Sequence, residues 1–180
     1  DQATRAEYLQ RFSVEAKASA KLSHQSIVTV YDAGEQDGVP WLAFEYVDGE
    51  RLDVLLHRCG RLPLQKMIGI GCDIAAALAA AHRRHIVHRD IKPANILLDA
   101  ADGIAKIADF GIVKAPWTGV TQVGSTVGSP GYMSPEQIEG REVDHQSDLF
   151  SLGVVLYEMA AGMHPFVRGT VASTVFATVS

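Results

Sequence analysis

Residues 88–99 read HRDIKPANILLD, and the triplet DFG follows at residues 109–111. Two carboxylates, an ammonium and an amide therefore lie close together in the chain, on Asp90, Asp109, Lys92 and Asn95. Carboxylate and amide oxygens are ligands that Mg²⁺ prefers, and an ammonium neutralises phosphate charge. The stretch is typical of a site that handles phosphate and a divalent cation.

The composition is that of an ordinary globular domain. The chain has 180 residues, 47% hydrophobic and 21% charged, with a net charge of −5. With an acidic balance and no basic run, we expect no nucleic-acid partner and no membrane contact from this segment. The apolar stretch at residues 74–81 is shorter than the roughly 20 residues that a bilayer-spanning helix needs. Two cysteines with unrelated flanks, Cys59 and Cys72, favour a reducing, cytoplasmic location.

The first part of the chain predicts a helix followed by a β-hairpin. Residues 4–22 have apolar side chains at helical spacing. The β-rich stretches 27–34 and 40–47 flank an Asp-Gly turn, which predicts antiparallel pairing. Residues 48–60 predict a short helix ended by Gly60.

A long Ala-rich helix is predicted from Leu64 to about His85. Its apolar residues recur at helical spacing, whereas Gly69 and Gly71 each weaken a helix by about 1 kcal/mol relative to Ala. This segment supplies the first large helical face of the predicted core.

The second part predicts another hairpin, a loop and more helix. Residues 95–99 and 105–110 form the expected hairpin, and residues 111–136, rich in Gly, Pro, Ser and Thr, form a long loop. Residues 146–161 are apolar almost all round, which predicts a buried helix. From Arg168 a further amphipathic helix is expected. The order of elements predicts an α+β fold.

HRDIKPAN, DFG, then SPE at residues 134–136 and DLFSLG at residues 148–153 together resemble a eukaryotic-type Ser/Thr protein kinase of the kind found in bacteria. One triplet alone would mean little, but four motifs in this order are specific. The resemblance implies a protein-kinase-like fold. Residues 1–47 would form a partial N-lobe, with helix C, a hairpin and the start of the hinge. Residues 48–180 would form most of the helical C-lobe.

The resemblance assigns a chemical task to each residue of the opening motif. Asp90 would accept the proton of the substrate hydroxyl or orient that hydroxyl, and Lys92 would stabilise the transferring γ-phosphate. Asn95 and Asp109 would bind Mg²⁺, with Mn²⁺ as an alternative, and ATP would be the phosphate donor. Each residue alone could equally be a turn-former in a polar loop, and the ordered set favours the catalytic interpretation.

The same matching implies a nucleotide site. Glu15 would pair with a strand lysine that grips the ATP phosphates, and backbone groups of the hinge would bind adenine, so that hinge side chains carry little information. A gatekeeper, the hinge, a residue beneath the adenine ring and the residues at DFG complete it. The implied set is Glu15, Phe44, Glu45, Tyr46, Val47, Leu97, Ala108 and Asp109.

Two residues imply a Ser/Thr substrate. Protein kinases for Ser/Thr carry a lysine at the place of Lys92, and Ser129 stands where the family more often has Thr, with a hydroxyl that would bridge Asp90 and Lys92. Protein substrates with Ser or Thr are therefore the expected partners.

Arg89, beside the catalytic Asp, implies regulation by a phosphate on the activation loop, which a guanidinium binds bidentately. A second copy of the kinase is then a candidate partner that adds this phosphate. Thr121 is the first candidate by its distance from Ser129. The full set is Thr121, Thr118, Ser125 and Thr126.

Structural roles are implied for a further set: His88, Arg89, Phe110, Gly111, Ser129, Glu136 and Asp148. His88 would pack beneath the turn at Phe110. Asp148 would hold the backbone of the catalytic loop, or cap its own helix, or both. A zinc site at the evenly spaced His82, His85 and His88 is not expected, because no carboxylate or Cys completes the ligand set.

Some family motifs are not found. No G-x-G-x-x-G-x-V occurs, no V-A-I-K precedes Glu15, the Arg that would pair with Glu136 is missing, and Ser19 is an unusually small, polar residue for its place. We therefore expect this polypeptide alone to be an incomplete, inactive piece of an active parent. The alternatives are a non-catalytic kinase-fold scaffold and a small-molecule phosphotransferase, which the SPE segment and Lys92 disfavour. A membrane anchor elsewhere in the parent stays open.

Overall fold

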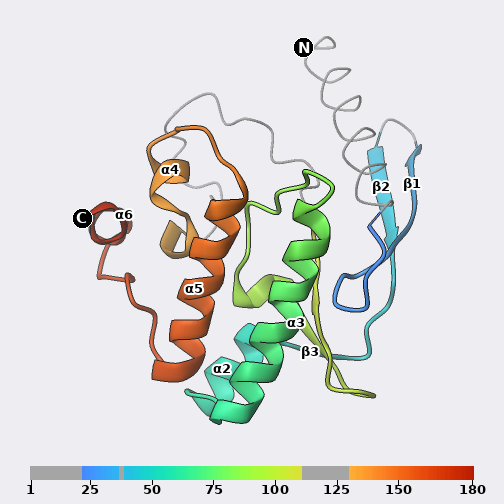
Figure 1. The fold of residues 1–180 in the computed structure, drawn as a ribbon, viewed down its shortest axis with the longest axis horizontal. Coiled ribbons are helices and arrows are strands. Elements are labelled where there is room, and N and C mark those ends of the chain that lie inside the picture. Colours follow the sequence, from blue (N-terminus) through green and yellow to red (C-terminus); the bar gives the residue numbers. More distant parts are fainter. Residues whose placement is uncertain (1–21, 37–38, 111–129) are drawn as a thin grey trace.

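The computed structural model describes residues 22–36, 39–110 and 130–180, and every structural statement below refers to these ranges. Residues 4–21 of the predicted helix and the Asp-Gly turn lie outside these ranges, and Leu22, the last residue predicted for that helix, is not helical. In chain order (Figure 1) the elements are β1 Val30–Gln36, β2 Val39–Phe44, β3 Gly49–Arg51, α2 Leu52–Cys59, α3 Leu64–His82, η1 Pro93–Asn95, β4 Ile96–Asp99, β5 Ala105–Ile107, η2 Pro130–Tyr132, α4 Pro135–Ile138, α5 His145–Ala161 and α6 Val171–Val179.

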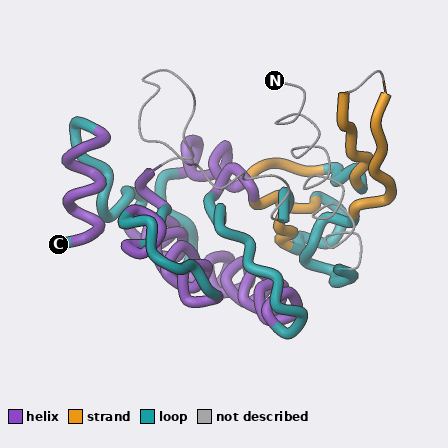
Figure 2. The backbone as a smooth tube through the Cα atoms, turned by 90° about the horizontal axis from the view of Figure 1, so that it is seen from above, coloured by secondary structure: helices purple, strands orange, loops and turns teal. Residues whose placement is uncertain are grey.

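The α+β prediction is confirmed. β1 and β2 form an antiparallel pair, and β4 lies between β3 and β5 in a second antiparallel sheet. Figure 2 shows strands gathered at one end of the molecule and helices at the other. Both predicted hairpins are therefore present.

The segment before β1 links the two sheets. Ile27 forms a parallel bridge with Ile107 of β5. The Val28 N–H donates to Ile107 O at 2.9 Å, and the Ile107 N–H donates to Ser26 O at 2.9 Å. This pairing between distant segments fixes the strand that leads into DFG.

The core lies between α3, α5 and the three-stranded sheet. α3 buries Ile74 and Leu78. α5 buries Leu152, Val155 and Met159 on the side toward α3. Figure 1 shows α3 and α5 side by side, and the two helices are in contact.

By length and composition alone, α3 could cross a membrane, since an 18-residue window within its 19 residues has a mean hydropathy of 1.4. The apolar stretch is longer than residues 74–81, on which the expectation rested. In the structure Ile74 and Leu78 of α3 are buried in the domain core. The same pattern is typical of the central helix of a folded domain.

Several predicted boundaries are wrong for local reasons. The helix predicted at residues 48–60 begins at Leu52, because Gly49–Arg51 pair with β4 instead. The predicted helix from Leu64 stops at His82, and His85 has a φ of 58°.

The second hairpin is shorter than predicted. Asn95 belongs to the short helix η1, so β4 begins at Ile96. β5 ends at Ile107, and Asp109 adopts a left-handed φ of 59° that a strand cannot contain. In the described part of the predicted loop at residues 111–136, η2 forms and α4 begins.

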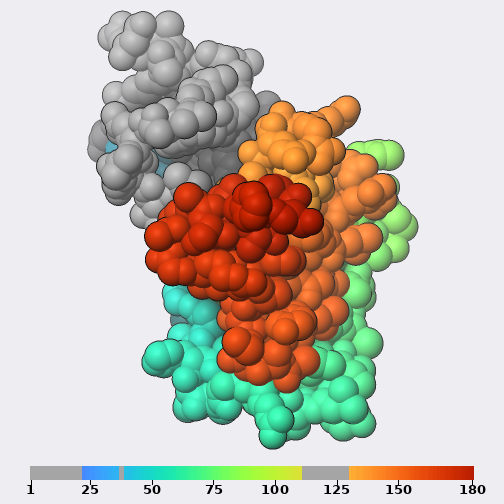
Figure 3. All heavy atoms as spheres, turned by 90° about the vertical axis from the view of Figure 1, so that its left-hand side faces the viewer, coloured from blue at the N-terminus to red at the C-terminus, as the bar shows by residue number. Residues whose placement is uncertain are grey.

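The burial of side chains on the two C-terminal helices differs from what their sequences suggested. α5 leaves Leu149 51% and Tyr157 49% exposed, so it is not buried all round. α6 buries Thr174 and Thr178 and leaves Phe176 70% exposed. Figure 3 shows α6 on the outside of the molecule.

Gly69→Ala is expected to stabilise the fold by about 1 kcal/mol, because Ala is a better helix former than Gly. A Cβ at position 69 of α3 would have no heavy atom within 4 Å outside its chain neighbours and the adjacent helix backbone, and the φ of Gly69 is not positive. Urea denaturation of the purified protein measures the change in the free energy of unfolding.

Gly49→Ala is the matched comparison, because the same substitution there is expected to destabilise the fold. A Cβ at Gly49 would lie 1.9 Å from Leu98 O of β4, so the strand pair must move apart. We expect a loss of about 1–3 kcal/mol, as for other overpacking changes. Equal effects of the two substitutions would contradict this account.

Candidate active site

Residues 88–95, which we call the catalytic loop after the role predicted for Asp90, are held by Asp148, which is fully buried near the start of α5. Its Oδ2 accepts from the His88 N–H at 2.9 Å, and its Oδ1 accepts from the Arg89 N–H at 2.8 Å. His82 Nε2 lies 2.7 Å from the same carboxylate. One side chain thus joins the end of α3, the start of α5 and the loop.

The alternative role of Asp148 as a helix cap is wrong. The N-cap of α5 is Asp144, whose side chain accepts from the Gln146 N–H at 2.8 Å. Asp148 lies inside the first turn, and both its oxygens face the loop.

His88 supports the loop from within. Its ring is 1% exposed and lies edge-on to Phe110, with centroids 4.7 Å apart. Its Nδ1 accepts from the Asp90 N–H at 3.1 Å, so Nε2 carries the proton and donates to Ala108 O at 2.9 Å. The contact connects the catalytic loop to the residue before DFG.

The polar residues of the opening motif converge on one carboxylate. Lys92 Nζ lies 2.9 Å from Asp90 Oδ2, and Asn95 Nδ2 donates to the same oxygen at 3.0 Å. Asn95 Nδ2 also donates to the Asp90 carbonyl at 2.9 Å. The Asp90 and Lys92 side chains are 19% and 18% exposed, so the pair is partly shielded yet open to a ligand.

Asn95 and Asp109 are brought to adjacent strand ends. The Ala108 N–H donates to Asn95 O at 2.9 Å, continuing the ladder between β4 and β5. Because Asn95 uses its nitrogen on Asp90, its amide oxygen is left for other donors or cations. One carboxylate and one amide oxygen fit Mg²⁺, which is usually held by one or two carboxylates together with substrate phosphates.

A metal site built from protein ligands alone would need several His, Cys, Asp or Glu side chains close together. In the described ranges, no group of three or more His, Cys, Asp and Glu could hold an ion. His82 and His88 each have separate partners, Asp148 and Ala108.

At the hinge, Glu45 makes contacts through its side chain as well as through its backbone. Its N–H donates to Thr29 O at 2.8 Å, its Oε2 accepts from the Thr29 N–H at 3.1 Å, and its Oε1 pairs with Lys106 of β5. Burial acts to raise the pKa of Glu45, but the hydrogen bonds from Lys106 and Thr29 outweigh it, and the pKa lies below its usual value. The Glu45 side chain therefore contributes to the structure of the hinge, a role that the sequence did not predict.

The other predicted nucleotide-site residues differ in exposure. Phe44 is 37% and Tyr46 86% exposed. Val47, Leu97 and Ala108 are half-buried, on the hinge, β4 and the end of β5.

Glu45→Gln is expected to cost about 1 kcal/mol of stability at pH 7, because the Lys106 contact loses its charge. The folded pKa of Glu45 is lowered, so its contribution is present above the usual pKa and is lost as the pH falls through the folded value. The stability gap between wild type and variant should therefore narrow as the pH falls below the usual Glu pKa of about 4.3, and close below the lowered folded pKa. Urea denaturation at a series of pH values measures this gap.

Glu35→Gln makes the same chemical change at an exposed position of β1, away from Lys106, and is the control. If Glu45→Gln behaves like Glu35→Gln, the pair with Lys106 contributes nothing to the folded state.

Several predicted residues lie outside the described ranges. These are Glu15, Gly111, Thr118, Thr121, Ser125, Thr126 and Ser129. Glu136, by contrast, is described, and its carboxylate accepts from Ser147 Oγ of α5.

Contacts that the sequence did not reveal surround the loop. Tyr132 Oη donates to Glu158 Oε2 at 2.6 Å. Burial is the larger cause, and this hydrogen bond the next, of a raised pKa of Tyr132. Both residues line a cavity of about 410 Å³ that also reaches Pro93 of the catalytic loop and Asp53 of α2. The residues that line this cavity are far apart in the sequence, so sequence patterns could not predict it.

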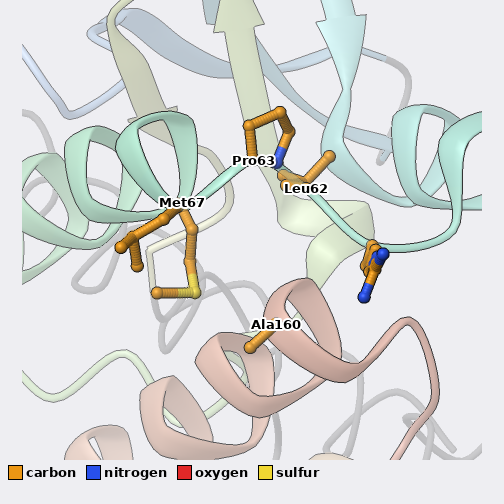
Figure 4. A pocket seen from close by; sticks show the side chains of 6 residues that line it. Leu62, Pro63, Met67 and Ala160 are labelled. Carbon is orange, nitrogen blue, oxygen red and sulfur yellow. The ribbon is translucent and has the colours of Figure 1, made fainter.

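A second cavity, of about 430 Å³, lies where the connection from α2 to α3 meets the end of α5. Figure 4 shows Leu62, Pro63, Met67 and Ala160 around it. None of the predicted site residues lines it.

A strand-rich part, a helical part and a catalytic loop clamped by a buried Asp define a domain of the protein-kinase class. The protein kinase domain family matches residues 1–179 of this chain. The chain therefore belongs to the protein kinase family, and the resemblance found in its motifs is confirmed.

The relatives are bacterial Ser/Thr protein kinases. A probable serine/threonine-protein kinase of Clostridium perfringens is 44% identical over 89% of the chain and 23% of that protein. PknB of Mycobacterium leprae is 43% identical over 92% of the chain and 28% of that protein. PknL of Mycobacterium tuberculosis is 39% identical over 94% of the chain and 43% of that protein. The chain thus spans less than half the length of each relative.

Proposed function

We propose that the full-length protein transfers the γ-phosphate of ATP to Ser and Thr hydroxyls of proteins. This proposal rests on the position of the Asp90 carboxylate. It lies between Lys92 and Asn95, on a loop whose backbone is hydrogen-bonded to Asp148 of α5. The serine/threonine kinase names of the relatives support the same activity.

Each residue has a task that its position allows. Asp90 accepts a hydrogen bond from the substrate hydroxyl and takes its proton as the phosphate transfers. Lys92, beside Asp90, neutralises charge on the transferring group. Asn95 and Asp109 would hold Mg²⁺, which supplies positive charge to the phosphates.

The hinge would hold the nucleotide. Backbone groups at Tyr46 and Val47 are our candidates for adenine, with Leu97 beneath the ring and Phe44 at the back. The Glu45 contact with Lys106 ties this segment to β5, and its contact with Thr29 ties it to the residues before β1. A nucleotide bound at the hinge and a metal at Asn95 and Asp109 would then lie near the same strand end, between the proposed lobes that meet after residue 47.

The test is transfer from radiolabelled ATP with Mg²⁺ to a generic basic protein, using the full-length protein, followed by phosphoamino-acid analysis. Phosphoserine and phosphothreonine in the acceptor support the proposal. Transfer only to small-molecule hydroxyls would replace it with a small-molecule phosphotransferase, and ATP binding without transfer would favour a scaffold. Peptide mapping of the kinase itself in the same reaction reports whether Thr121 or its neighbours are modified.

A further inference from the structure

The backbone of the catalytic loop is in an uncommon conformation at Arg89. Its φ is 66°, and in the described ranges only His85 and Asp109 share a positive φ among non-glycine residues. Such conformations cost energy for a residue with a side chain, and they persist when surrounding contacts hold them in place. The contacts at Arg89 therefore bear directly on where Asp90 points.

Arg89 is held on both of its backbone polar groups. Its N–H donates to Asp148 Oδ1 at 2.8 Å, and its carbonyl accepts from Gln137 Nε2 of α4 at 2.9 Å. The next N–H, that of Asp90, donates to His88 Nδ1 at 3.1 Å. The peptide between Arg89 and Asp90 is thus fixed at its C=O by Gln137 and at its N–H by His88.

The orientation of the Gln137 amide is determined by its two partners. Its Oε1 accepts from the Ser134 N–H at 3.0 Å, and its Nε2 donates to the Arg89 carbonyl. A flipped amide would face donor with donor and acceptor with acceptor, so only the observed orientation satisfies both. Gln137 thereby completes the capping box of α4 and bonds the catalytic loop with the same side chain.

We propose that Gln137 is a positioning residue for phosphate transfer, which acts through the Arg89–Asp90 peptide on the Asp90 carboxylate. Without the Gln137 donor, that peptide can rotate about Arg89, and the carboxylate moves with it. The contact also connects α4 to the catalytic loop. This inference rests on the proposed kinase activity.

Gln137→Glu in the full-length protein separates the two bonds. The carboxylate keeps an oxygen for the Ser134 N–H but places a second oxygen against the Arg89 carbonyl, where a donor is needed. We expect kcat to fall about tenfold, the loss that one hydrogen bond explains, with KM for ATP within about twofold of wild type. A merely structural role would change the melting temperature without this split between kcat and KM.

Ser134→Ala is the matched control, because it removes the hydroxyl that accepts from the Gln137 N–H and leaves the Arg89 contact intact. It should lower Tm by about 2–4 °C and leave kcat within about twofold. An unchanged kcat in Gln137→Glu, or an equal loss of kcat in Ser134→Ala, would overturn the inference. A wild type without transfer activity would instead overturn the proposed function, and the inference with it.

Discussion

Asp90→Asn is expected to lower kcat for phosphate transfer by about 10²–10⁴-fold, the range that a positioned general base contributes. Asn has nearly the same size, and its oxygen can still accept from Lys92 or Asn95, so the loop keeps its packing. It cannot take a proton, and it lacks the charge that orients the attacking hydroxyl. KM for ATP and the unfolding midpoint should stay close to those of the wild type.

The experiment compares initial rates of transfer for the full-length wild type, Asp90→Asn and Glu142→Gln. Glu142 is an exposed carboxylate between α4 and α5, so its neutralisation changes the net charge equally and leaves the site alone. A variant at position 90 with more than a tenth of the wild-type kcat would show that Asp90 does not act as the base. Loss of ATP binding would show that the substitution disturbs the nucleotide site instead.

The sequence could predict the part of the site that is contiguous. Asp90, Lys92 and Asn95 lie on one short loop, and their order alone indicated that they converge, as the structure shows. The placement of Asp109 followed from the second hairpin, whose existence, though not its exact ends, was also predicted.

Contacts between distant residues could not be predicted in this way. Gln137 reaches Arg89 across 48 positions, and Lys106 reaches Glu45 across 61. The spacing of Ser134 and Gln137 signals a capping box but not the contact with Arg89, and the three-residue strand β3 is too short and polar for any periodicity. These features exist because α4 and β5 are packed against the loop and hinge, which is a property of the tertiary fold.

Asp148→Ala is expected to destabilise the protein by about 3–5 kcal/mol, the cost of breaking a buried, hydrogen-bonded charge site. The Asp148 side chain is fully buried and accepts from the backbone N–H groups of His88 and Arg89 while it also contacts His82. Removing it leaves all three without that partner in a region with little access to water. The left-handed conformation of Arg89 then loses one of its two supports.

Asp144→Ala is the matched control, because Asp144 is four positions earlier, on the same helix end, and exposed. It removes only an N-cap, so the expected loss is about 1 kcal/mol. Urea denaturation of both variants and the wild type gives the two losses, and the transfer assay should show a lower kcat for Asp148→Ala alone. Equal losses of stability would mean that Asp148 serves the helix and not the loop. A large loss of stability at Asp148 with unchanged kcat per folded molecule would mean that Gln137 and His88 suffice to hold Asp90 in place.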